Sequence, residues 1–156
     1  MPEDFLCRVL RESLADVLEK MFFIRILDDQ PSAADPLAEQ IASRLSFHGN
    51  PSGSLTLQLQ RRVARSIAGD FLAAEEQELS DLQVGEVICE LTNMICGAVL
   101  SRVESTVTFR LASPQLVRPA PAHTGAVVCS VPLGPGAITV AMSTETPICP
   151  PAEYAF

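Results

Sequence analysis

Two pairs of apolar or alternating segments, each pair joined by a short turn, constrain the fold of this chain more than any other feature of its sequence. The segments are 45–48 and 55–60 around a turn at 49–53, and 126–131 and 137–142 around a turn at 132–136. An alternation with a period of two gives a strand one apolar face. Turns rich in glycine, proline, asparagine and serine join neighbouring antiparallel strands. We therefore predict two β-hairpins in a sheet that buries one face.

Helical spacing predicts three helices, at 3–21, 61–75 and 80–103. A further strand is predicted at 106–111, closed or bent by Pro114. Because the strands come in hairpins and do not alternate with helices, the predicted fold class is α+β, with helices packed on a largely antiparallel sheet. The segment 28–36, which contains two prolines, is predicted to be a loop, and 146–156 an irregular C-terminal arm.

Length and composition bound the classes of protein to consider. A chain of 156 residues can bury one self-sufficient core, so a single domain over 1–156 is predicted. With 19 acidic against 11 basic residues, its formal net charge of −8 argues against charge-driven binding to nucleic acid or anionic membranes. Five cysteines without a C-x-x-C spacing argue against a disulfide scaffold or zinc site. Without a signal-peptide pattern or a long uncharged apolar run, the chain is predicted to be cytoplasmic.

The predicted helix at 80–103 carries different residues on its two sides. Ser80 and Gln83 have the spacing of a capping box at its start. At 100° per residue, one stripe is apolar and must face the core: Val84, Ile88, Leu91, Ile95 and Ala98. The opposite stripe has polar or small residues at i, i+4, i+7 and i+11: Glu86, Glu90, Asn93 and Gly97. Two carboxylates and a carboxamide are therefore predicted to project away from the core, beside a glycine that leaves room.

Such a stripe has two interpretations. Most surface helices have a solvated polar side, so the stripe can be purely structural. Alternatively, a carboxylate can pair with a cation on a partner while a carboxamide, which both donates and accepts hydrogen bonds, orients a water molecule. Orientation of this kind suits phosphoryl transfer, in which positioning and charge neutralisation supply most of the catalysis. The local pattern leaves both interpretations open.

A family resemblance adds to this pattern. Glu90-Leu91-Thr92-Asn93 in mid-helix, followed after a strand by Ser113-Pro114, resembles the E-x-x-N…P signature of the CheC/CheX/FliY phosphatases of bacterial chemotaxis. The end of the first helix, 18–23, also looks like the opening helix of CheX-like domains, the members most similar over the whole chain. Glu86 stands where the family commonly has Asp or Ser, and 20 residues separate Asn93 from Pro114. The first helix has no second E-x-x-N, so one site per chain is expected.

The resemblance implies a fold, an activity and a partner. The activity is removal of the phosphoryl group from the aspartyl-phosphate of a CheY-like response regulator. Glu90 would pair with a lysine of the regulator and Asn93 would orient the attacking water, while Glu86, Gly97 and Pro114 would contact the partner or, for Glu86, simply be solvated. The regulator would bring Mg²⁺, so this chain would need no metal or cofactor of its own. The resemblance also implies that this chain forms a homodimer. The alternative is a non-catalytic module that binds a response regulator or associates with the flagellar switch.

Other chemistry-bearing residues have plainer interpretations. His48 and His123 lack a nucleophile at a convincing position. Cys89 and Cys96 are seven residues apart and are expected to be buried or boundary thiols. The basic cluster of Arg61, Arg62 and Arg65 is expected to be solvated.

Overall fold

The computed structural model describes residues 2–21, 40–103, 108–122, 125–133 and 136–146. Its helices are α1 (Pro2–Met21), α2 (Arg61–Leu72), the short 3-10 helix η2 (Glu76–Glu78) and α3 (Asp81–Val103). Its strands are β1 (Gln40–His48), β2 (Gly53–Gln60), β3 (Arg110–Leu111), β4 (Gln115–Val117), β5 (Val127–Leu133) and β6 (Gly136–Thr144). All the strand pairs are antiparallel, which confirms the α+β prediction. The loop predicted at 28–36 and all but the first residue of the predicted C-terminal arm lie outside the described residues.

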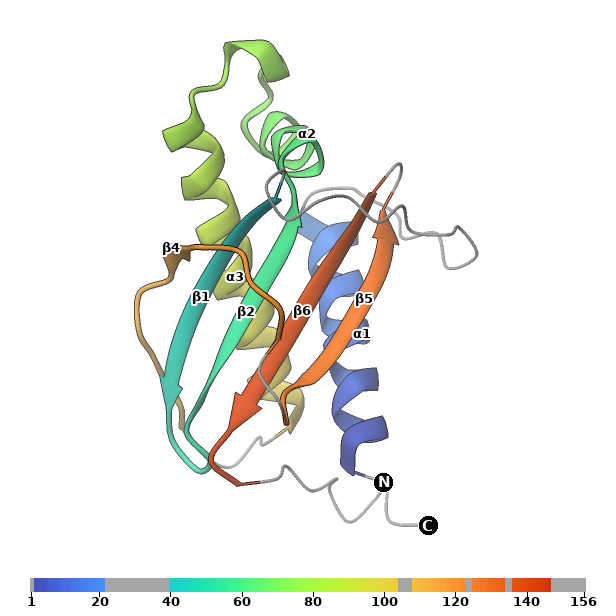
Figure 1. Ribbon diagram of the computed structural model, residues 1–156, viewed down its shortest axis with the longest axis vertical. Helices are drawn as coiled ribbons and strands as arrows, with labels where there is room; N and C mark the ends of the chain where they lie inside the picture. Colours follow the sequence, from blue (N-terminus) through green and yellow to red (C-terminus); the bar gives the residue numbers. More distant parts are fainter. Residues whose placement is uncertain (1, 22–39, 104–107, 123–124, 134–135, 147–156) are drawn as a thin grey trace.

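Both predicted hairpins are present and meet at the centre of the sheet. The strand order is β3-β1-β2-β6-β5, so the β1–β2 hairpin joins the β5–β6 hairpin through β2 and β6 (Figure 1). That central pairing runs from Gly53 opposite Thr144 to Leu59 opposite Ile138. β1 begins earlier than the predicted strand, at Gln40.

The outer edge of β1 is covered by an interrupted strand. The predicted strand at 106–111 is reduced to Arg110–Leu111 within the described residues, and pairing with β1 resumes at β4. One extra residue separates the two paired stretches relative to β1, as in a β-bulge. Pro114 has no N–H to donate to the ladder, which explains the interruption.

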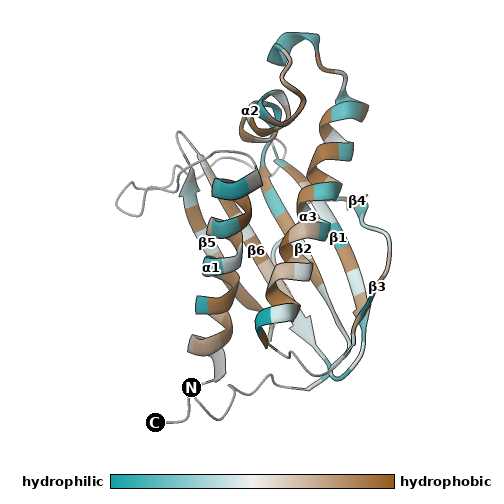
Figure 2. Ribbon diagram, turned by 180° about the vertical axis from the view of Figure 1, so that it is seen from behind, coloured by the Kyte–Doolittle hydropathy of each residue, from teal (hydrophilic) through white to brown (hydrophobic). Residues whose placement is uncertain are grey.

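The helices cover one face of the sheet. α1 and α3 lie side by side across it, and α2 lies near one end (Figures 1 and 2). Alternate residues of β2 and β6 point into this layer and are almost fully buried: Leu55, Leu57, Leu59, Ile138, Val140 and Met142. α1 and α3 contribute the opposing layer, including Leu10, Leu14, Ile88, Leu91 and Ile95, each 0% exposed. The core therefore lies between the helices and a single face of the sheet.

α3 is the most apolar helix in the described part of the chain. By length and composition alone it could cross a membrane. Its apolar residues, however, form the helix side of the core just described, so packing in a folded domain accounts for them.

Candidate functional site

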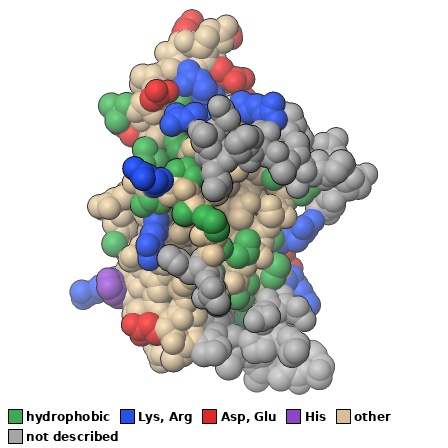
Figure 3. Space-filling view, in the orientation of Figure 1, with side chains coloured by type: hydrophobic (Ala, Val, Ile, Leu, Met, Phe, Trp, Pro, Cys, Tyr) green, Lys and Arg blue, Asp and Glu red, His purple; other side chains and the backbone are tan. Residues whose placement is uncertain are grey.

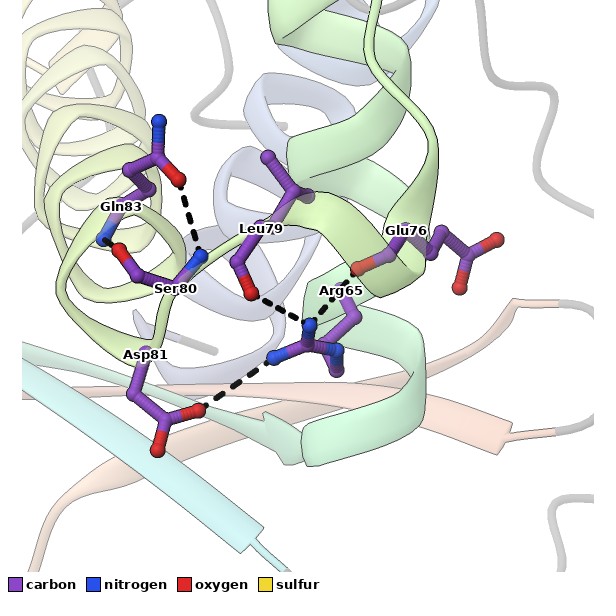
Figure 4. Close-up of polar contacts among 6 residues, drawn as sticks. All are labelled: Arg65, Glu76, Leu79, Ser80, Asp81 and Gln83. Atoms are coloured by element: carbon purple, nitrogen blue, oxygen red, sulfur yellow. Dashed lines mark hydrogen bonds and ion pairs between the residues drawn. The ribbon is translucent and has the colours of Figure 1, made fainter.

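The start of α3 is capped by its own side chains (Figure 4). The backbone N–H of Gln83 donates to Ser80 Oγ at 3.1 Å, and the backbone N–H of Ser80 donates to Gln83 Oε1 at 2.9 Å. These two reciprocal bonds satisfy donors that a helix N-terminus leaves unpaired. The predicted capping box is confirmed.

Arg65 of α2 holds the segment that leads into α3. Its Nη2 donates to the carbonyl oxygens of Glu76 and Leu79, both at 2.7 Å, and its Nη1 donates to Asp81 Oδ1 at 3.3 Å (Figure 4). The prediction of a solvated side chain is wrong for Arg65, because the turn after α2 returns the chain over its guanidinium. One side chain thus joins α2, η2 and the first turn of α3.

We expect Arg65→Met to lower the free energy of unfolding by about 2 kcal/mol, since it keeps the apolar stem but leaves two carbonyls without their charged donor. Urea unfolding followed by circular dichroism measures the effect. The matched control is Arg61→Met, which changes an exposed side chain in the first turn of the same helix and should cost no more than about 0.5 kcal/mol. Equal losses in the two variants would contradict an anchoring role for Arg65.

The other end of α3 is tied to α1. Arg102 donates from Nη1 to the buried Ser13 Oγ at 3.1 Å and from Nη2 to Asp16 Oδ2. Side-chain hydrogen bonds therefore fix both ends of α3 to neighbouring helices.

The polar stripe lies on the side of α3 away from the core. We call Glu86, Glu90, Asn93 and Gly97 the α3 ridge. Glu86 and Glu90 are exposed, while Asn93 and Gly97 are half-buried. A Cβ added to Gly97 would meet nothing within 4 Å, so this glycine leaves open space. On the opposite side Ile88, Leu91 and Ile95 are fully buried, whereas Ala98, predicted for the core stripe, is only partly buried.

Leu82 extends the α3 ridge by one turn and was not predicted. It precedes Glu86 by four residues, so it lies on the same side of the helix. Its relative exposure of 71% is the highest among the large apolar side chains described. The i, i+4 spacing between Leu82 and Glu86 could have indicated that Leu82 belongs to the ridge, but a leucine at this position is equally consistent with a core residue.

Pro114 lies outside the α3 ridge, half-buried at the interruption between β3 and β4. The strand that follows it reaches α3, because a Cβ on Gly85 would lie 2.7 Å from Leu116 Cδ1. Next to this contact, Ser43 Oγ of β1 donates to Cys89 Sγ at 3.6 Å. Leu116 is 50% exposed, so an apolar side chain of the sheet edge flanks the α3 ridge.

The two buried cysteine thiols among the described residues, Cys96 and Cys129, are poorly suited to nucleophilic chemistry. Burial raises the pKa of the Cys96 thiol to about 12. Burial, followed by the nearby Cys7 thiol, raises the pKa of Cys129 to about 11. Both groups are therefore protonated at neutral pH, and a protonated thiol is a weak nucleophile and metal ligand. Cys96 is buried and Cys89 half-buried, as expected of core and boundary thiols.

A raised pKa also makes stability depend on pH. The pKa of Cys96 in the folded protein lies above the ordinary thiol value of 9.0, so the protonated thiol stabilises the folded state. This contribution to the free energy of unfolding is complete below pH 9 and is lost as the pH rises towards 12. We expect the free energy of unfolding of the wild type to fall more steeply between pH 9 and 11 than that of Cys96→Ala. Urea titrations across this range test the prediction, and parallel pH profiles would contradict it.

Metal-ligating groups are not clustered in the part of the chain that the structure describes: no three His, Cys, Asp or Glu side chains come together there. His48 is exposed at the end of β1, and His123 lies outside the described residues. What the described site offers is a carboxylate and a carboxamide on a fixed helix, with apolar side chains beside them.

Comparisons with known proteins agree with this fold. The sequence profile of the family described as "Chemotaxis phosphatase CheX" matches residues 41–129, more than half of the chain. No curated protein matches the chain in sequence. The solved structure of CheX from Vibrio vulnificus is similar, with a TM-score of 0.72 and 20% identity over 90% of this chain and 96% of that one.

Two further solved structures are informative. The CheX-CheY-BeF3-Mg²⁺ complex from Borrelia burgdorferi matches with a TM-score of 0.71 and 15% identity, over 89% of this chain and 97% of that one. FliY from Thermotoga maritima is less similar, with a TM-score of 0.58 and 13% identity over 90% of this chain and 88% of that one.

Proposed function

Because this chain belongs to the CheX family of chemotaxis phosphatases, we propose that it removes the phosphoryl group from the aspartyl-phosphate of a CheY-like response regulator. The observation that carries the proposal is the placement of Glu90 and Asn93, one turn apart on the solvent side of a helix held at both ends. The crystallisation of the Borrelia burgdorferi relative together with CheY, BeF3 and Mg²⁺ supports the choice of partner.

In the proposed mechanism two side chains of the α3 ridge, Glu90 and Asn93, have separate roles. The Glu90 carboxylate pairs with a lysine of the regulator and fixes the orientation of docking. The Asn93 carboxamide holds a water molecule in line with the bond between phosphorus and the aspartate oxygen. The water oxygen bonds to phosphorus, the bond to the aspartate oxygen breaks, the aspartate leaves as a carboxylate, and both protons of the water leave with the phosphate. Mg²⁺ bound by the regulator neutralises the developing charge.

The remaining ridge residues, together with Pro114, would shape the docking surface. Gly97 leaves space next to Asn93 for the regulator's backbone, and Glu86 adds a negative charge one turn before Glu90. Pro114 interrupts the sheet edge beside α3 and so determines where the edge strand turns towards the helix. We also propose that the chain acts in the cytoplasm as a homodimer, as the family resemblance implies; light scattering of the purified protein tests the dimer.

Leu82 should contribute to docking without taking part in the chemistry. An exposed leucine at one end of the α3 ridge can bury its side chain against the regulator. We expect Leu82→Ala to raise the dissociation constant for the regulator about fivefold, a loss near 1 kcal/mol, with kcat unchanged. Calorimetric titration and initial rates test this. The control Leu111→Ala removes an exposed leucine from β3 and should leave both values unchanged.

The proposed activity is tested by the decay of a phosphorylated regulator. A purified CheY-like protein is labelled with phosphate in the presence of Mg²⁺, and loss of label is followed with and without this chain. A shortened lifetime supports the phosphatase. An unchanged lifetime, at concentrations where calorimetry shows binding, would instead support a non-catalytic docking module.

A further inference from the structure

The face of the sheet opposite the helices has a different character from the core face. Side chains of β1, β2 and β6 that point to this face are polar or small, among them Arg44, Thr56, Gln58, Thr139 and Ser143. After β4 the chain crosses over this face, in front of β1 and β2 in the view of Figure 1. We call residues 118–122 the strap.

Gln58 holds the strap on the sheet. The backbone N–H of Ala120 donates to Gln58 Oε1 at 3.2 Å, and Gln58 Nε2 donates to Gln40 Oε1 at 2.6 Å. Both the amide oxygen and the amide nitrogen of the Gln58 side chain are thus hydrogen-bonded. The strap therefore forms a wall above the sheet and is attached to it.

A cleft of about 340 Å³ lies between the strap and the sheet. Its polar lining consists mainly of hydroxyl groups from neighbouring strands: Ser54, Thr56, Thr139 and Ser143. Its apolar lining includes Val117, Pro121 and Val128. A second hollow of about 330 Å³ along β4 shares Arg44 and Val117 with the first. The volume and mixed lining fit a small molecule.

The charge of the cleft is opposite to that of the protein. Among the described residues that line it, the charged side chains are Arg44 and Arg118, and none is acidic. The whole chain, in contrast, has a formal net charge of −8. Figure 3 looks onto this face and shows basic side chains along its β1 edge and also at the end near α2, where most of the acidic ones lie. Arg44 also lies within hydrogen-bond distance of a hydroxyl, with Nη2 3.4 Å from Ser54 Oγ.

We propose that this cleft binds a small organic phosphate. Two guanidinium groups match the charge of a phosphate monoester, which is about −1.5 to −2 at pH 7. The hydroxyl groups of Ser54, Thr56 and Ser143 supply further donors for its three terminal oxygens, which together accept more hydrogen bonds than the two oxygens of a carboxylate. Val117, Pro121 and Val128 provide the apolar contact for the organic group. The cleft is on the opposite side of the sheet from the α3 ridge, so the proposal does not depend on the phosphatase function.

The test uses phenyl phosphate as the probe, with calorimetry for affinity and amide chemical shifts for location. Phenyl phosphate should shift the amides of Thr56, Gln58 and Thr139. Arg44→Gln and Arg118→Gln should each weaken its binding at least tenfold, whereas Arg110→Gln, which removes an exposed arginine of β3 outside the cleft, should leave it unchanged. Decay of the phosphorylated regulator should be the same in all three variants.

Each comparison can overturn the proposal. If the wild type and the two cleft variants bound phenyl phosphate equally tightly, Arg44 and Arg118 would not be part of the binding site. Binding of benzoate as tight as that of phenyl phosphate would contradict the preference for phosphate. Binding of inorganic phosphate as tight as that of phenyl phosphate would contradict a contribution from the apolar lining. Circular dichroism of the variants, whose substituted side chains are exposed, confirms that they are folded.

Discussion

Asn93→Ala is expected to slow the dephosphorylation of the response regulator by about 100-fold, because the attacking water loses the group that aligns it with phosphorus. Binding should change little, since Glu90 and Leu82 remain in place. The half-buried Asn93 side chain faces solvent from α3, so its removal leaves no cavity in the core. Single-turnover decay of the labelled regulator at saturating concentrations of the variant measures the rate without interference from affinity.

Two matched variants separate the roles on the α3 ridge. Asn93→Gln keeps the carboxamide but moves it by one methylene group, so it should also be slow if position matters. Glu90→Gln keeps the shape of the side chain and removes its charge, so it should weaken binding more than it slows the bound reaction. A wild-type rate in saturating Asn93→Ala would refute the water-orienting role, whatever the effect on binding.

Leu91→Ala is expected to lower the free energy of unfolding by about 2–5 kcal/mol, the range for large-to-small substitutions in a packed core. Leu91 belongs to the E-x-x-N segment, but its side chain is 0% exposed and points away from Glu90 and Asn93 into the layer between helices and sheet. The loss follows from apolar contacts and from the cavity left behind. Urea unfolding with a common slope for both proteins measures it.

Leu82→Ala is the control for this second prediction. It makes the same chemical change on the same helix, but at a side chain with 71% relative exposure. Its cost should stay within about 0.5 kcal/mol, as for most surface substitutions. Similar losses in the two variants would mean that the two sides of α3 do not differ in burial as the structure describes.

Much of the fold could be predicted because its signals are local. Alternation and turn residues identified both hairpins, and the 3.6-residue period identified α1, α2 and α3. The capping box was visible because its two partners are three residues apart. The same period predicted which side of α3 faces the core.

The features that were not predicted depend on contacts between distant segments. β4 has three residues and follows a proline, so it becomes a strand only because β1 offers a free edge. The sequence predicts a solvated side chain for Arg65, whereas in the structure the turn after α2 places two backbone carbonyls within hydrogen-bond distance of its guanidinium. The cleft exists because the strap returns across β1 and β2, which no periodicity encodes.

The candidate site likewise has one part that the local sequence predicts and another that depends on contacts with distant segments. The spacing of Glu86, Glu90, Asn93 and Gly97 predicts that they share one side of a helix. The exposure of each ridge side chain depends on the neighbouring edge of the sheet. There Leu116 lies against Gly85 of α3, and Ser43 donates a hydrogen bond to Cys89 of α3. This neighbourhood could not be deduced from a sequence in which these partners lie more than 30 residues away.

The arginines at the two ends of α3 have a consequence for the thermodynamics of docking. Arg65 and Arg102 restrain a helix whose solvent side has two small residues near its middle, Asn93 with two side-chain torsions and Gly97 with none. The backbone entropy of this surface is therefore lost mainly when the chain folds, and what a partner restricts on binding is the rotation of exposed side chains such as Glu90. A rigid helix of this kind can present the same geometry to every incoming regulator.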